Sequence, residues 1–160
     1  MAAMTASSHA SSAPMLAWHY TLGVHLLRIL ENGYILPQDT PDTPAVECPV
    51  AWFSLNQQHD PSALKSILVN GKPQPPTLVV MRQLGNGVYR LGISPRALLG
   101  GEALRREARI SKARWAELLK QAKARGANAA EWFGSIDPVA ASDCVIEVLG
   151  DDGRWQRVAS

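Results

Sequence analysis

The sequence predicts an α+β domain with a mixed or antiparallel arrangement of strands, because strand-like segments outnumber helical ones and are joined mostly by loops and hairpins. Three observations support this class. A β-favouring segment at 16–20 runs directly into a helical apolar repeat, and later segments flank Asn-Gly and Asp-Asp-Gly, which are hairpin turn signals. No glycine-rich phosphate turn opens a helix, which argues against a doubly wound parallel sheet.

The first structured unit is predicted to be a strand followed by a helix. Residues 16–20 are large and β-favouring, and Thr21 is a candidate helix cap. Gly33 is expected to end the helix in a left-handed conformation. The apolar stripe at helical spacing consists of Leu22, Leu26, Leu27, Ile29 and Leu30.

The middle of the chain is predicted to alternate between loops and strands. Residues 37–47 hold three prolines and several acids and indicate a surface loop, whereas 50–54 alternate as a strand. Residues 56–76 are polar and proline-rich around a short apolar patch, and a loop of that length is more often functional than idle. Residues 77–94 have two β-branched runs around a Gly-Asn-Gly turn, which predicts a hairpin.

The last third is predicted to contain a helix and a second hairpin. Residues 95–109 are basic and form at most a short helix that is interrupted at a double glycine. Ser111 is a candidate cap for a helix that reaches Arg125 and ends at Gly126. Residues 142–158 then form a hairpin around Asp-Asp-Gly.

Length and composition predict one globular domain over residues 15–160, preceded by a disordered tail over residues 1–14. The 160 residues are 46% hydrophobic and 19% charged, and the formal net charge of +2 neither requires nor excludes a nucleic-acid partner. Cys48 and Cys144 match no metal-ligand spacing and are interpreted as reduced thiols of a cytoplasmic protein.

Several classes of protein are not expected. The tail has neither a basic start nor a continuous apolar stretch, so a signal peptide is not predicted. No run of about 18 apolar residues occurs, so no membrane-spanning helix is expected. The four histidines show no ligand spacing with cysteine or carboxylate, so no metal site is expected either.

Two short segments carry candidate chemistry. If the first strand continues far enough, His19 and Thr21 share one face, and an imidazole beside a hydroxyl suits a ribose or a carboxamide. In the second strand Trp52 and Ser54 share a face opposite Phe53. A flat ring beside a hydroxyl suits a planar heterocycle. The alternative interpretation for each segment is ordinary core packing.

These segments, WHYT, LGVHLLRILENGYILP and PVAWFS, resemble the amino-terminal half of ADP-ribosyltransferase-like proteins over about residues 16–54. That superfamily includes poly- and mono-ADP-ribosyltransferases, DNA-modifying toxins of the DarT kind and RNA 2′-phosphotransferases. The resemblance implies two small, mostly antiparallel sheets that form a cleft with flanking helices. It also implies NAD or a related ribose-containing ligand as cofactor.

The resemblance assigns roles residue by residue. His19 would hydrogen-bond the nicotinamide-side ribose, Thr21 would shape the carboxamide site, and Phe53 would stack on nicotinamide where the family often has tyrosine. A register shift of one residue would give the stacking role to Trp52. The implied cofactor-binding set consists of His19, Tyr20, Thr21, Trp52, Phe53, Ser54 and Arg90, the last as a phosphate contact.

The family also uses a late glutamate as a catalytic residue together with the histidine. Glu131 lies in a connection next to Trp132 and is preferred, whereas Glu147 lies inside a strand and is the competing candidate. The expected activity is transfer of ADP-ribose to a protein, nucleic acid or small acceptor. Two alternatives stay open, namely a non-catalytic interaction module on the same fold and a nucleic-acid-binding protein that uses the basic stretch 96–109.

Overall fold

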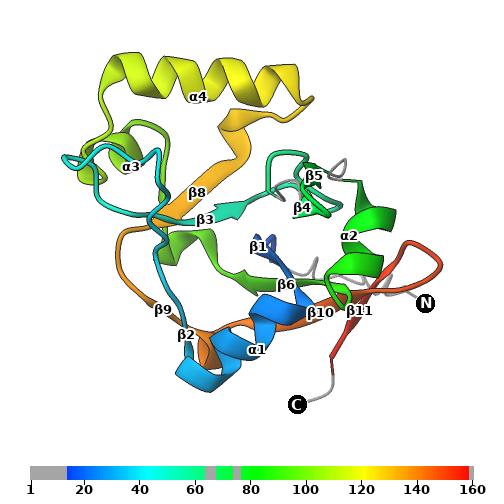
Figure 1. The fold of residues 1–160 in the computed structure, drawn as a ribbon. Helices are drawn as coiled ribbons and strands as arrows, with labels where there is room; N and C mark the ends of the chain where they lie inside the picture. Colours follow the sequence, from blue (N-terminus) through cyan, green and yellow to red (C-terminus); the bar gives the residue numbers. More distant parts are fainter. Residues whose placement is uncertain (1–13, 64–67, 74–76, 159–160) are drawn as a thin grey trace, which may run out of the picture.

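The computed structural model describes residues 14–63, 68–73 and 77–158, so the predicted disordered tail lies almost entirely outside the described residues. Its central feature is an antiparallel sheet with the strand order β11-β10-β6-β1-β3-β8-β7 (Figure 1). The seven strands are β1 (Ala17–Leu22), β3 (Ala51–Ser54), β6 (Val88–Ile93), β7 (Leu99–Gly100), β8 (Trp132–Ser135), β10 (Val145–Leu149) and β11 (Trp155–Arg157).

The sheet has a narrow joint in its middle. Strand β1 pairs with β6 over six residues, but it pairs with β3 only at Trp18 and Ser54. The prediction of two separate small sheets is therefore wrong, because this pair joins a four-stranded part to a three-stranded part in one sheet. The α+β class and the mostly antiparallel pairing are confirmed.

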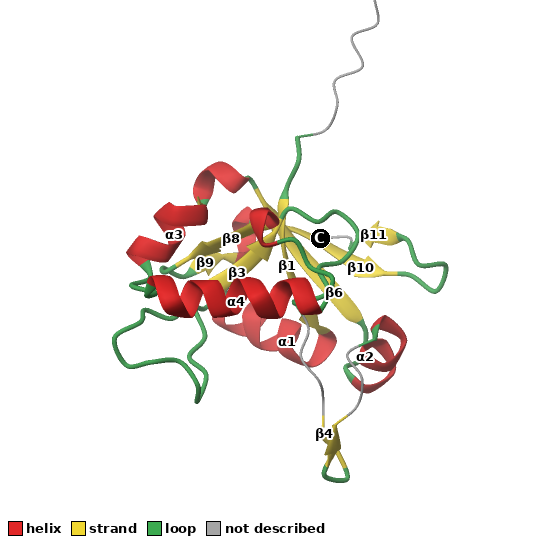
Figure 2. Ribbon diagram, turned by 90° about the horizontal axis from the view of Figure 1, so that it is seen from above, coloured by secondary structure: helices red, strands yellow, loops and turns green. Residues whose placement is uncertain are grey.

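Within the described residues, four α-helices and two small two-stranded sheets surround the large sheet. Figures 1 and 2 place α4 and α1 on opposite sides of it, with α2 near one end of β6. The helices are α1 (Gly23–Asn32), α2 (Leu78–Leu84), α3 (Gly101–Glu107) and α4 (Lys112–Ala124). The two-residue strands form the pairs β2 (Tyr34–Ile35) with β9 (Val139–Ala140) and β4 (Leu68–Val69) with β5 (Lys72–Pro73).

Alternation along β1 sends its side chains into two different cores. Ala17 belongs to the core under α1, which also contains Phe53 and Leu91. Trp18 and Tyr20 point to the opposite face and pack in a second core with the buried Met81 of α2, Val88 and Leu149. A third cluster lies between β3 and the α3–α4 region, and its buried members are Val50, Leu104, Ala108 and Ile110.

Two local predictions are wrong. Thr21 does not cap α1, because β1 continues to Leu22 and the helix begins directly after it without a side-chain cap. Residues 78–84 form α2 and not a hairpin strand, since the Thr77 hydroxyl caps this helix at Val80 N and Met81 is completely buried. The Asn-Gly turn still adopts positive φ, but it connects α2 to β6.

Other predicted elements are confirmed. Gly33 ends α1 at φ 79°, in the left-handed region, and Ser111 Oγ accepts a hydrogen bond from Arg114 N at the start of α4. The C-terminal hairpin is β10 and β11. The double glycine at residues 100–101 marks the start of α3, so the basic segment does contain a short helix. No described helix has the length and apolar character that crossing a membrane requires.

Candidate functional site

A groove of about 750 Å³ lies at the joint between β1 and β3. It touches the consecutive residues Trp18, His19 and Tyr20 of β1. Neighbouring residues of a strand point to opposite faces of the sheet. A groove that contacts three consecutive residues of β1 therefore reaches both faces, which is possible where β1 and β3 separate. The remaining walls come from α4 and the loop before β3, and the groove also contacts Trp52, Phe53, Ser54, Asp60, Arg114, Gln121, Arg125 and Trp132.

His19 bridges the two strands beyond the point where their pairing stops. Its Nδ1 lies 2.8 Å from the carbonyl oxygen of Trp52, and its ring lies 5.5 Å from that of Phe53 between centroids. A carbonyl oxygen only accepts hydrogen bonds, so Nδ1 carries the proton. Burial lowers the pKa of His19, which favours the neutral imidazole and leaves Nε2 as an acceptor.

A hydrogen-bonded cluster at the same end of the groove includes a carboxylate that the sequence analysis missed. Asp60 is buried, and its two oxygens accept hydrogen bonds from Ser54 Oγ at 2.7 Å and from Ser62 N and Oγ at 2.9 and 2.6 Å. Tyr20 donates its hydroxyl proton to the Asn56 carbonyl oxygen. The Asp-Pro-Ser turn signal within the long 56–76 connection is the sequence feature that could have drawn attention to Asp60.

Three tryptophans pack together beside the groove, and two of them, Trp52 and Trp132, line it. Trp52 is stacked on Trp115 with centroids 6.5 Å apart, and Trp132 packs edge-on against both rings. Trp52 is 37% exposed, whereas Phe53 is 2% exposed on the opposite strand face with His19. The two candidates for stacking on a ligand therefore lie in different surroundings, with Phe53 at the joint and Trp52 on the open wall.

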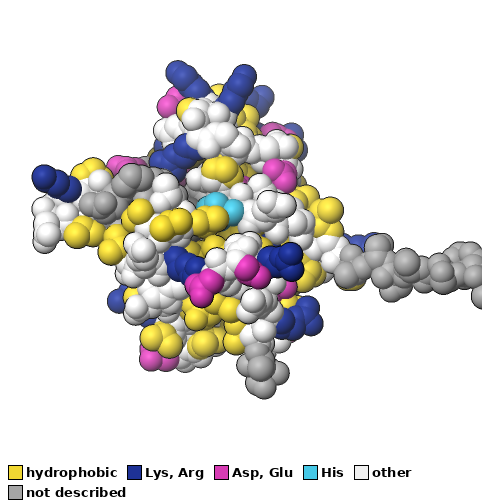
Figure 3. Space-filling model, turned by 90° about the vertical axis from the view of Figure 1, so that its right-hand side faces the viewer, with side chains coloured by type: hydrophobic (Ala, Val, Ile, Leu, Met, Phe, Trp, Pro, Cys, Tyr) yellow, Lys and Arg dark blue, Asp and Glu magenta, His cyan; other side chains and the backbone are white. Residues whose placement is uncertain are grey.

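The α4 wall of the groove is cationic. Arg114, Gln121 and Arg125 all line the groove, and the Arg114 Nε lies 3.6 Å from a carboxylate oxygen of the buried Glu47. Eight of the 16 lysines and arginines lie within residues 101–126. Figure 3 shows Lys and Arg side chains gathered at the top of that face, at the level of α4. Arg114 is partly neutralised by Glu47, and Asp42 also lines the groove, so Arg125 is the cation on this wall best placed to meet an anionic group.

Glu131 lies next to the groove but outside its lining. It ends a short 3₁₀ turn immediately before β8, and its carbonyl oxygen accepts a hydrogen bond from Leu55 N at 2.8 Å. Its negative charge is one of the influences that raise the pKa of Tyr20 to about 12, after burial as the largest cause.

Three other predicted residues also lie outside the groove lining. Thr21 is buried on the His19 face of β1, opposite Tyr89 of β6. Arg90 forms an ion pair with the competing candidate Glu147, and the Arg90 guanidinium stacks over the indole ring of Trp18. The structure thus brings together His19, Tyr20, Trp52, Phe53 and Ser54, and it places Thr21, Arg90 and Glu147 elsewhere.

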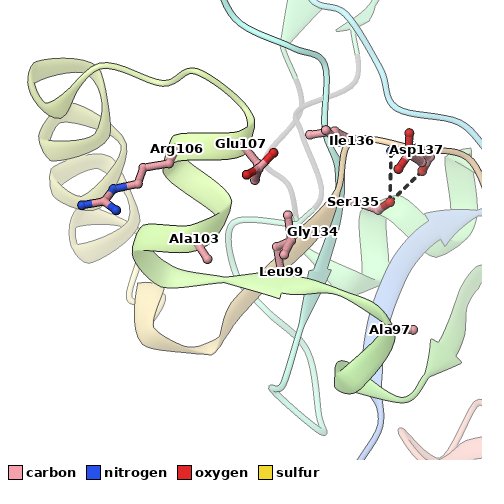
Figure 4. A pocket seen from close by; sticks show the side chains of 9 residues that line it. All are labelled: Ala97, Leu99, Ala103, Arg106, Glu107, Gly134, Ser135, Ile136 and Asp137. Carbon is pink, nitrogen blue, oxygen red and sulfur yellow. Dashed lines mark hydrogen bonds between the residues drawn. The ribbon is translucent and has the colours of Figure 1, made fainter.

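A second cavity of about 540 Å³ lies between α3 and β8 (Figure 4). The side chain of Arg106 points away from it in Figure 4 and pairs with Glu102. The hydroxyl of Ser135 is occupied by hydrogen bonds with the backbone of Asp137. The remaining polar lining consists of the carboxylates of Glu107 and Asp137. The groove at the sheet joint, which combines aromatic walls with polar groups of several kinds, is the better candidate site.

The remaining candidate chemistry is sparse. Cys48 and Cys144 are free thiols, and burial raises the pKa of Cys144 to about 11, so this thiol stays protonated at neutral pH. Within the described ranges, no group of three His, Cys, Asp or Glu residues could hold a metal ion.

Comparison with protein-family models, curated proteins and solved structures found no match to this chain.

Proposed function

We propose that this protein binds NAD in the groove at the sheet joint and acts as an ADP-ribosyltransferase. The observation that carries the proposal is the placement of His19. Its ring lies against Phe53 where β1 and β3 separate, with Nδ1 bound to Trp52 O and Nε2 left as an acceptor for a ribose hydroxyl. The resemblance of the WHYT and PVAWFS segments to this superfamily supports the same assignment.

The two ends of the groove match the two kinds of groups in NAD. The His19 end offers an acceptor and aromatic surface for a ribose and a nicotinamide ring, whereas Arg125 is the candidate for the pyrophosphate, because Arg114 pairs with Glu47. This reassigns the phosphate contact from Arg90, whose guanidinium already pairs with Glu147. Trp52 offers an exposed ring on which an adenine could stack.

In the proposed reaction the bond between ribose C1′ and the nicotinamide nitrogen breaks, and nicotinamide leaves with the bonding electron pair. An acceptor atom then forms a bond to C1′ and loses its proton. Glu131, which directly precedes the groove-lining Trp132, would stabilise the positive charge that develops on the ribose.

The test is a calorimetric titration of the full chain with NAD, repeated with His19→Ala and with His25→Ala as matched control. His25 is exposed on α1, away from the groove. We expect the parent and His25→Ala to bind equally and His19→Ala to bind about tenfold or more weakly. His19→Ala should also lower the melting temperature modestly, because Trp52 O loses its hydrogen bond, so binding is measured at a temperature at which all three proteins are folded.

Other outcomes select the alternatives. NAD binding without release of nicotinamide in the parent would favour the non-catalytic interaction module. Loss of stability in His19→Ala with NAD binding intact would make His19 a core residue and remove the main support of the proposal.

A nucleic-acid-binding protein is the second candidate, and the cationic segment 101–126 favours it. Within the originally predicted stretch 96–109, Arg105 and Arg106 pair with Glu102, so the cations of α4 are better placed for phosphate contacts. Binding of an oligonucleotide that weakens steeply with added salt, with no binding of NAD, would support this candidate.

A further inference from the structure

The segment that follows β3 crosses from the three-stranded part of the sheet onto the four-stranded part. We call residues 55–60 of this segment the strap. Three consecutive carbonyl oxygens of the strap each accept a hydrogen bond from a side chain of a different strand. The contacts run from Tyr20 Oη of β1 to Asn56 O, from Arg90 Nη1 of β6 to Gln57 O, and from Trp155 Nε1 of β11 to Gln58 O, the last at 2.7 Å.

The three donors lie on one face of the sheet. Tyr20 and Arg90 are direct partners between β1 and β6. Arg90 is opposite Glu147 of β10, and Trp155 is opposite Leu149, two residues further along the same strand. Because alternate residues of a strand share a face, the donors form a row from the joint to β11, which is an edge strand of the sheet.

The side chain of Gln57 attaches the strap at the joint itself. Its Nε2 donates to Leu16 O at 2.9 Å and to Leu55 O at 2.8 Å, and its Oε1 accepts a hydrogen bond from Trp18 Nε1 at 3.0 Å. This amide therefore links the chain before β1 to the chain after β3, next to the single residue pair through which these two strands meet.

Both ends of the strap reach groups at the groove. Asp60 lines the groove and accepts a hydrogen bond from Ser54 Oγ at 2.7 Å. At the other end, Leu55 N donates to Glu131 O at 2.8 Å, directly before the groove-lining Trp132. A displacement of the strap would therefore move Asp60 and the segment that carries Glu131.

We propose that the strap couples the edge strand β11 to the groove, and that Trp155 is a positioning residue for the carboxylates of Asp60 and Glu131. Trp155 does not line the groove, and its indole N–H reaches the groove only through the strap. The effect of Trp155 on a reaction rests on the proposed function, whereas its effect on the strap depends on the fold alone.

Amide hydrogen exchange of Trp155→Phe tests the anchor, because this change removes the indole N–H and keeps an aromatic ring against Arg90. The amides of Leu55, Gln58 and His59, which are all hydrogen-bonded, should exchange about threefold to tenfold faster. The amides of α1 and α4 should keep the rates of the parent. Equal acceleration in these helices would mark a general loss of stability and overturn the local anchor.

Gln156→Ala is the matched control, because Gln156 is the exposed neighbour of Trp155 on the other face of β11. It should leave the exchange of the strap unchanged. If Trp155→Phe does not fold, Tyr20→Phe, which removes the donor to Asn56 O, replaces it. Unchanged exchange of the strap in the variant that folds would overturn the inference.

Turnover of NAD tests the positioning role. Nicotinamide release by Trp155→Phe should fall about tenfold with the affinity for NAD nearly unchanged, because the carboxylates act mainly as the glycosidic bond breaks. Gln156→Ala should turn over NAD at the rate of the parent. Faster exchange of the strap in Trp155→Phe with unchanged turnover would overturn the positioning role.

If the parent does not turn over NAD, the proposed function fails, and the coupling is tested without a ligand. The chemical shift of the Asp60 carboxyl carbon reports the hydrogen bond from Ser54. A change of this shift in Trp155→Phe but not in Gln156→Ala would support the coupling. The same shift in all three proteins would overturn it.

Discussion

Arg90 and Glu147 form an ion pair between neighbouring strands, with Arg90 Nη2 2.6 Å and Nε 2.7 Å from Glu147 Oε2. The guanidinium also lies between two indoles, with its Cζ 3.9 Å from the centroid of Trp18 and 4.3 Å from that of Trp155. The side chains of Arg90 and Glu147 are only 7% and 16% exposed. This arrangement connects β1, β6, β10 and β11, so both charged residues have a structural role.

The first prediction follows from this burial. Glu147→Gln removes one charge of the pair and leaves the Arg90 guanidinium without its carboxylate, so we expect the free energy of unfolding to fall by about 3 kcal/mol. Urea denaturation measures this change. Glu31→Gln, at an exposed position on α1, is the control and should shift stability by less than about 0.5 kcal/mol. If Glu147→Gln and the parent have the same free energy of unfolding, the ion pair makes no net contribution to stability.

The second prediction concerns the close approach of Gly92 to the ring of Trp18. A Cβ at residue 92 would lie 2.5 Å from Trp18 Cζ3, so Gly92→Ala must displace the indole. We expect a loss of about 1–3 kcal/mol in urea denaturation. The near-ultraviolet circular dichroism should also change, because Trp18 moves relative to Arg90. An unchanged spectrum and stability would contradict the packing of this indole.

The third prediction is that stability decreases on acidification. Burial lowers the pKa values of His19 and His59 from 6.5, so the unfolded chain binds protons that the folded protein does not. The contribution of the two neutral imidazoles is complete above pH 6.5 and declines as pH falls below it towards the lowered pKa values. Denaturation between pH 8 and 5 should show this decline.

Variants separate this histidine effect from general acid denaturation. Replacing both His19 and His59 by Gln should make the free energy of unfolding depend less on pH between pH 7 and 5. The same replacement at His25, which is exposed on α1, should leave it unchanged. Stability that rises on acidification over this range would contradict the burial of the two imidazoles.

The fourth prediction concerns Glu131 and depends on the proposed function. Glu131→Gln keeps the size of the side chain and loses its charge, so nicotinamide release should fall about a hundredfold or more. The affinity for NAD should change little, because the charge matters mainly as the glycosidic bond breaks. Glu107→Gln, at an exposed position on α3, is the control. A larger effect of Asp60→Asn would assign the catalytic carboxylate to Asp60.

The sequence by itself determined the local features of this protein. Alternation along residues 17–22 places His19 and Thr21 on one face of β1, and the glycine after Asn32 ends α1. Ser111 starts α4, and the Asp-Asp-Gly turn connects β10 to β11. These features depend on backbone preferences within a few residues, which a sequence displays directly.

Only the tertiary structure decided what these elements face. The run Leu-Val-Val-Met has strand-like composition, but it forms α2 because Thr77 caps it and Met81 fills the core beside Trp18. The single pair between Trp18 and Ser54 joins the sheet and creates the groove, and Asp60 reaches Ser54 from the following loop. Such contacts depend on which strands become neighbours and on what a loop covers, and local periodicity carries no information about either.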